Sequence, residues 1–335
     1  MPADSELWIP PLSLKAQKRI NGRQKYQRLV KWTGFPEKTL WDWLQLLSVL
    51  AIPVVITGGT LWFSAVQSLA SFQVSENQHQ ADIQSANEQQ QETALQTYLD
   101  RMSDLLLNSK LRESQLGDEV RNVARARTLT ILPQLNSTRK GELVRFLKEA
   151  GLIDQESVIV SLVGADLGGA SLDGVNLSGT YLSRVDLSWA SLDGADLSHA
   201  NLVNTNLVGA DLSEANLDSS NLRAAALWKA KLVYANLNQA SLSGAWLSEA
   251  YLSYANFSGA DLSGAAFLDT TLSHANLMRT DLRDVNFGGL KLNGNYIKGT
   301  DLSYANLENA EVTPEQLKQA YSLKGAIMPD GSKHP

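Results

Sequence analysis

The sequence predicts an all-β solenoid of four-sided coils, preceded by a transmembrane helix and an α-helical connector. Three observations predict it. A large apolar residue, usually Leu, recurs at every fifth position from 162 to 312. No charged residue lies from Trp43 to Ser75, and the stretch 76–155 is rich in Gln, Glu, Leu and Arg. We expect five segments: a basic N-terminal arm (1–40), a transmembrane segment (41–73), a helical stalk and connector (74–155), the repeat domain (156–312), and a capping helix with a tail (313–335).

Charge divides the chain into parts with different roles. The 335 residues carry a net charge of -6. Residues 1–40 contain eight Lys or Arg and three Asp or Glu, whereas residues 160–310 contain eight Lys or Arg and fifteen Asp or Glu. The absence of cysteine excludes disulfides, thiolate metal sites and a cysteine nucleophile.

The uncharged run 43–75 is long enough to cross a bilayer, which requires about twenty apolar residues. Pro53 and the pair Gly58–Gly59 could kink one span or turn the run into a re-entrant hairpin. A buried helix of a soluble domain is the other alternative. We expect one transmembrane helix within 41–73. Tryptophans lie near its ends, as is typical of the membrane interface: Trp41, Trp43 and Trp62.

Positive charge is concentrated before the apolar run, and the first basic residue after it is Arg101. The positive-inside rule therefore predicts a cytoplasmic N-terminus, with the rest of the chain on the other side of the membrane. The basic residues could also contact anionic lipid, at about 1 kcal/mol per side chain, or form a solvated arm that only sets topology. The residues assigned to lipid contact are Lys15, Lys18, Arg19 and Arg23.

The connector is expected to contain three helices. ENQHQADIQSANEQQQETALQTYLDRMSDLLLN predicts a long one, polar all round in its first half and with an apolar stripe in its second. GDEVRNVARARTLTIL predicts a second helix capped by Asp118, and NSTRKGELVRFLKEAG a third that begins near Ser137 and ends at Gly151. The three could form a bundle or a lid over the repeat domain. A basic strip, solvated or binding a partner, would comprise Arg121, Arg125 and Arg127.

A five-residue period fits neither a helix nor a strand, whose periods are 3.6 and 2.0. Of the 31 central positions from 162 to 312, 26 hold Leu, and Ala fills 19 of the 31 positions two residues earlier. If each unit forms one side of a square coil, both residues point inward and four units complete a turn. Leu then stacks on Leu between coils, small residues occupy the corners, and backbone pairing sets a rise of about 4.8 Å.

The repeated pattern A(D/N)LXX resembles the pentapeptide-repeat family over residues 160–312. The resemblance implies a right-handed quadrilateral β-helix. The ending VTPEQLKQAYSLKGAIMPDG is similar to the usual end of these domains, with Thr313 capping a short helix from Pro314 to about Ala320. The apolar run with the linker EVRNVARARTLTIL…KGELVRFLKEAGLI resembles membrane-anchored pentapeptide-repeat proteins of cyanobacteria. That resemblance implies a thylakoid or plasma membrane, with the repeats lumenal or periplasmic.

One region departs from the pattern. In NFGGLKLNGNYIKGT the small-residue positions hold Leu290 and Asn295. Asn295 would face the interior and would require a hydrogen bond there. We expect a distorted coil at 285–300, although the five-residue period itself continues without an insertion.

The repeats offer no catalytic constellation. His199 and His274 both lie at outward positions, on different faces and nearly four coils apart, so they cannot share a metal ion or a proton. The serines have no histidine base beside them, and the Asp/Asn column predicts amide ladders between coils. A convex rod without insertions has no concave pocket. We therefore predict a non-enzyme that holds no cofactor and no metal.

Aromatic residues gather at outward positions of two neighbouring faces in two adjacent coils. Exposed aromatic side chains are favoured anchors of protein interfaces, although scattered tolerance at outward positions would give the same pattern. We expect this patch to dock a partner protein or a membrane protein complex. Its residues are Trp228, Tyr234, Trp246, Tyr251 and Tyr254.

Two other functions compete with a membrane-anchored scaffold. Some pentapeptide-repeat proteins are acidic rods that imitate duplex DNA and block topoisomerases. Acidic residues do gather on one side of the first coils, but the acidic excess of the repeats is small and basic side chains interrupt it. Nucleic acid is therefore not the expected partner. A rod that self-associates through the aromatic patch is the third possibility. The acidic group comprises Asp173, Asp193, Asp211 and Glu214.

Overall fold

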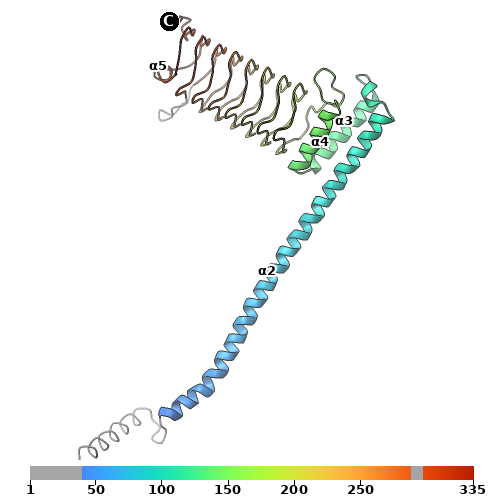
Figure 1. Cartoon of the computed structure of the whole chain (residues 1–335), viewed down its shortest axis with the longest axis vertical. Helices are drawn as coiled ribbons and strands as arrows, with labels where there is room; N and C mark the ends of the chain where they lie inside the picture. Colours follow the sequence, from blue (N-terminus) through green and yellow to red (C-terminus); the bar gives the residue numbers. More distant parts are fainter. Residues whose placement is uncertain (1–39, 288–296) are drawn as a thin grey trace, which may run out of the picture. The chain divides into compact units, whose positions relative to one another are not determined.

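The computed structural model describes residues 40–287 and 297–335. The chain divides into two compact units, Met1–Gln84 and Ser85–Pro335. The basic residues assigned to anionic lipid lie outside the described residues. The helices are α2 (Leu40–Leu107), α3 (Glu119–Ile131), α4 (Ser137–Glu149) and α5 (Pro314–Leu317), with 3-10 turns at Leu111–Glu113 and Leu132–Gln134 (Figure 1).

Helix α2 joins the predicted span and the predicted stalk in one helix of 68 residues. It continues through Pro53 and Gly58–Gly59, so the run does not form the re-entrant hairpin that the sequence left open. Its ribbon curves near its N-terminal end (Figure 1), as expected for a helix with an internal proline. From Leu44 to Val74 the large apolar side chains are all exposed, and the helix is long and apolar enough to cross a membrane.

The end of α2 packs with α3 and α4 in a small bundle. Tyr98 of α2 contacts Phe146 of α4 edge to face, and its hydroxyl lies 2.8 Å from that of Thr128 in α3. The predicted caps differ in detail. The side chain of Asn136, one residue before Ser137, caps α4, while that of Asp118 accepts the Gln115 N–H instead of capping α3. The buried residues of the bundle include Leu95, Met102, Leu111, Leu132 and Leu143.

The bundle also covers the first coil, so it is both bundle and lid. Gly141 lies so close to the coil that a Cβ there would overlap the Ser171 carbonyl oxygen. Lys140 donates to Asp166, 3.1 Å away, and to the Gly168 carbonyl, 3.0 Å away. Burial acts to raise the pKa of Asp166, but the Gly168 N–H and the Lys140 ammonium together hold that pKa below its usual value.

Two arginines of the predicted basic strip form hydrogen bonds at the contact between the bundle and the repeats. Arg121 donates to the Val158 carbonyl and Arg125 to the Val163 carbonyl, at 3.0 and 2.8 Å. These side chains therefore satisfy backbone acceptors where the bundle meets the repeats. They do not form an exposed strip with Arg127.

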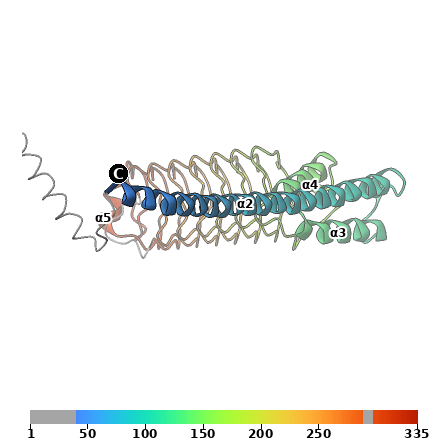
Figure 2. The ribbon, with the colours of Figure 1, turned by 90° about the horizontal axis from the view of Figure 1, so that it is seen from below.

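The repeats form stacked four-sided coils (Figures 1 and 2). Backbone pairing joins each residue before a central Leu to the equivalent residue twenty positions later, as in Asn201 with Asn221. Every described central residue from Leu162 to Leu307 is buried. Five corner positions hold Thr in place of Ala, and these hydroxyls donate to backbone carbonyls, as Thr205 does to Leu182. The coil thus tolerates a small polar corner residue because its hydrogen bond is satisfied.

The expected distortion at 285–300 is a change of register. Asn276 pairs with Asp301 and Asp281 with Asn306, so paired residues here are 25 positions apart, where elsewhere in the repeats they are 20 apart. The sequence-based expectation of no insertion is therefore wrong for this coil. In the sequence pattern, Leu290 and Asn295 stand where other units carry a small residue. Both lie outside the described residues.

The C-terminal end of the repeat domain is covered both by helix α5 and by the residues that follow it. Thr313 forms a capping box with Gln316 at the start of α5, which ends at Leu317, earlier than predicted. Ser322 then pairs with Asp301, and Ile327 pairs with Asn306. The predicted tail is thus a further coil, and its end pairs back on itself in an antiparallel bridge.

The predicted amide ladder is present along one face. Each asparagine side chain donates from Nδ2 to Oδ1 of the residue twenty positions earlier, at 2.9–3.1 Å, and the series ends on the carboxylate of Asp196. Such a series polarises its members and links successive coils. Its residues are Asn216, Asn236, Asn256 and Asn276.

Substitution of the middle of the ladder, Asn236→Ala, is expected to destabilise the repeats by about 1–3 kcal/mol, because it removes two bonds between coils and one within the turn. Thermal unfolding of the full chain in a non-ionic detergent measures the change. Gln239→Ala, in the same unit but outside the ladder, is the control. Equal melting temperatures for the two variants would show that the ladder does not stabilise the rod.

Candidate interaction site

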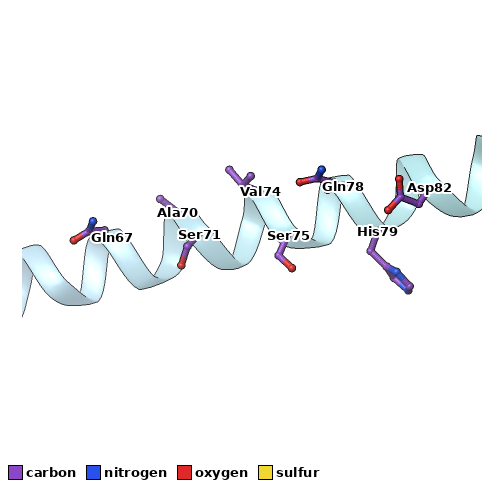
Figure 3. A pocket seen from close by; sticks show the side chains of 8 residues that line it. All are labelled: Gln67, Ala70, Ser71, Val74, Ser75, Gln78, His79 and Asp82. Carbon is purple, nitrogen blue, oxygen red and sulfur yellow. The ribbon is translucent and has the colours of Figure 1, made fainter.

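The described residues contain no group of three His, Asp or Glu side chains placed to hold a metal ion. A shallow hollow lies along one face of α2, where eight side chains line it (Figure 3). His79 and Asp82 are its titratable members, and all eight come from the same helix. A face of one helix has no opposing wall to exclude water or hold a substrate.

The aromatic residues singled out by sequence lie together on the repeat domain. The backbone of Trp246 pairs with that of Ala226 in the preceding coil, and Ala226 lies two residues before Trp228. The backbone of Tyr251 pairs with that of Lys231, which lies three residues before Tyr234. These pairings place the five aromatic residues on successive sides of two adjacent coils. Their side chains are between 40% and 66% exposed, with Trp246 the most exposed. We call Trp228, Tyr234, Trp246, Tyr251 and Tyr254 the aromatic patch.

Part of the patch is a stacked column. The rings of Tyr234 and Tyr254 lie 4.9 Å apart and nearly parallel, and His274 continues the stack at 5.0 Å from Tyr254. The patch predicted from the sequence did not include His274, because His274 was considered only as a possible metal or proton partner of His199. The signal was available, since His274 follows Tyr254 by twenty residues, one full coil. Both tyrosines remain exposed in this column.

Trp228 is held by charged neighbours. Its indole Nε1 donates to Glu249, 3.2 Å away, and the ammonium of Lys229 lies 4.1 Å from the centre of its ring. Lys229 also pairs with Glu249 at 3.5 Å. Trp246 has small neighbours instead, because Ala226 and Ala266 flank it in the adjacent coils. Trp246 is also the most exposed of the five, and its ring is therefore the most available to a partner.

The acidic group does not form a paired acid–base site. Asp211 binds Lys231 at 3.0 Å, and Asp173 accepts from the Ser191 hydroxyl and the Asp193 N–H. Burial acts to raise the pKa of Asp211, but hydrogen bonds from Ser213 and Lys231 keep it below its usual value. The Asp211 carboxylate therefore acts as an ion-pair partner of Lys231. Lys231 joins this group to the aromatic patch.

Comparison with known proteins identifies the repeats. The pentapeptide repeats model matches in eight copies between residues 161 and 295. HetL from the cyanobacterium Nostoc sp. strain PCC 7120, involved in heterocyst differentiation regulation, is 34% identical over 58% of this chain and 98% of its own, with a TM-score of 0.31. No curated protein matches the chain.

Two further structures are similar over shorter parts. Rfr23 from the cyanobacterium Cyanothece 51142 is 30% identical over 36% of this chain and 85% of its own, with a TM-score of 0.16. A pentapeptide repeat protein from the Arabidopsis thaliana thylakoid lumen is 21% identical over 44% and 72%, with a TM-score of 0.22. The matched repeats agree with the buried five-residue units. The chain therefore belongs to the pentapeptide-repeat family, whose repeats form a right-handed β-helix.

Proposed function

We propose that this chain is a non-catalytic, membrane-anchored scaffold whose repeat domain docks a partner protein through the aromatic patch. Pentapeptide-repeat proteins are typically structural or interaction modules. The single observation that carries the proposal is the exposed aromatic patch: five large rings on adjacent coils, at positions that the fold does not need for its core. Exposed aromatic rings that are not needed for packing are favoured interface anchors.

Membrane anchoring is supported by the first part of α2. Its large apolar side chains from Leu44 to Val74 are exposed, and water is an unfavourable environment for so many of them. A bilayer would cover most of them. The basic arm 1–40 favours a cytoplasmic N-terminus, and the linker resemblance favours a cyanobacterial thylakoid or plasma membrane. In that arrangement the repeats are lumenal or periplasmic.

Docking through the patch is supported by the arrangement of the rings. Trp246 is exposed beside small neighbours, so a partner can bury most of its surface at little cost to the rod. Tyr234 and Tyr254 are held by stacking, so fixing their rings on binding costs little entropy. Their hydroxyls supply hydrogen bonds at the edge of the contact.

The test is recovery of the partner with charged variants. Trp246→Glu and Tyr254→Glu are each expected to abolish recovery of the partner by the tagged full chain from detergent-solubilised native membranes, because a buried unpaired carboxylate opposes docking. Trp189→Glu and Tyr321→Glu are matched controls, exposed aromatic positions outside the patch, and should recover the partner normally. Unchanged recovery with the patch variants, or equal loss with the controls, would refute docking at the patch.

A further inference from the structure

A groove runs between the end of α2 and α3 in the unit Ser85–Pro335. It has a volume of about 320 Å³. Tyr98 and Arg101 line it from α2, and Arg127 and Ile131 line it from α3. The ring of Tyr98 is buried and forms part of its floor, together with alanine side chains. The remaining lining residues are Ala94, Thr97, Ala126, Thr130 and Gln134.

The groove has two positive charges and no counter-charge. No Asp or Glu lines it, and within 40–287 and 297–335 neither Arg101 nor Arg127 has a hydrogen-bond or ion-pair partner. The other arginines of the bundle are mostly engaged. Arg139, for example, pairs with Glu92 at 3.2 Å. Arginine stays protonated at all relevant pH values, so the charge at the groove is permanent.

Most donors of the neutral polar groups in the groove are already used, and the Gln134 amide keeps one free N–H. The hydroxyls of Thr97 and Thr130 donate to helix carbonyls, and the Gln134 amide donates to the Thr130 carbonyl. Tyr98 interacts with Thr128, and burial raises the pKa of Tyr98 to about 12, so its phenol is neutral. The two guanidinium groups are therefore the principal free donors of a groove that is also lined by the apolar side chains of Ala94, Ala126 and Ile131.

We propose that this groove binds a small amphiphilic anion: a carboxylate or a phosphate monoester joined to an apolar group. Guanidinium groups suit both anions, and the floor provides contact for the apolar part. The volume is at the lower end for ligand sites, which favours a small soluble molecule over a diacyl lipid. The basic arm 1–40 carries the wrong charge to fill the groove. This activity is separate from docking at the aromatic patch.

The test uses the full chain in a non-ionic detergent with 4-fluorophenyl phosphate and 4-fluorophenylacetate as probes, followed by fluorine NMR line broadening. At least one probe should bind saturably, and neutral 4-fluorobenzyl alcohol should not. Arg101→Gln and Arg127→Gln should each weaken binding about tenfold, as expected for loss of a charge-assisted hydrogen bond. Arg127→Lys keeps the charge and should retain more affinity than Arg127→Gln.

Arg145→Gln is the matched control, because Arg145 is an exposed arginine of α4 outside the groove, and it should bind within twofold of the parent protein. Absence of saturable binding, or equal binding of the neutral analogue, would overturn the proposal, as would a tenfold loss in Arg145→Gln. Displacement of the probe by phosphatidylglycerol added to the micelles, dependent on Arg101, would assign the groove to lipid headgroups and overturn the small-molecule ligand.

Discussion

The double substitution Val54→Arg and Val55→Arg is expected to move the chain from the carbonate-resistant membrane fraction to the soluble or aggregated fraction. Between residues 44 and 63 there are eleven Leu, Ile, Val and Phe residues, which together favour insertion by about 3–7 kcal/mol. Two central arginines oppose insertion by about 5–7 kcal/mol. The substitutions also remove two of the eleven apolar side chains, which lowers the favourable total to about 3–5 kcal/mol, so insertion is no longer favoured. Membrane extraction followed by immunoblotting measures the outcome.

The matched control places the same charges farther along α2. Ile83 and Ala86 lie in the polar part of the helix and are exposed. Ile83→Arg with Ala86→Arg should leave the protein in the membrane fraction. A double Val variant that still resists carbonate extraction would contradict a span in this run, as would a parent protein that is soluble without detergent.

The substitution Leu227→Ala is expected to lower the melting temperature of the repeats by about 4–20 °C. Leu227 is fully buried in its column, and removing such a side chain costs about 2–5 kcal/mol, partly because of the cavity left behind. Each kcal/mol corresponds to about 2–4 °C in a domain of this size. Tryptophan fluorescence during heating of the full chain in detergent reports the transition.

Leu268→Ala is the control for this substitution. Leu268 has the same chemistry in the same solenoid, but it lies at an outward position and is 47% exposed. Its replacement should change the melting temperature by no more than about 2 °C, since surface substitutions usually cost less than about 0.5 kcal/mol. Equal effects of the two variants would contradict the assignment of inward and outward positions.

The fold was predictable because each unit carries one Leu and one small residue at fixed places, and a four-sided coil buries both. The change of pairing from 20 to 25 positions after Asn276 was not, because the five-residue period continues through it unchanged. At Leu290 and Asn295 the sequence showed that packing must change, but not how. The break appears only in the pairing of Asn276 with Asp301.

The candidate sites differ in how far sequence could reach them. Counting in steps of twenty residues, the length of one coil, predicted that Tyr234 and Tyr254 lie together. One further step would have added His274. The same counting could not predict the contacts of the arginines in the bundle. Which of them meets a backbone carbonyl and which faces a groove depends on how three helices pack on the first coil. Arg101 and Arg127 lie 26 residues apart on separate helices, with no shared period to connect them.

Site-specific photocrosslinking in the native membrane tests the docking function most directly. A photoreactive phenylalanine analogue replaces Trp246 in the full chain, and the same analogue replaces Trp189 in a control. We predict one discrete crosslinked adduct from position 246, of higher mass than the chain, and none from position 189. Position 246 without an adduct, or the same adducts from both positions, would contradict a scaffold that docks its partner through the aromatic patch.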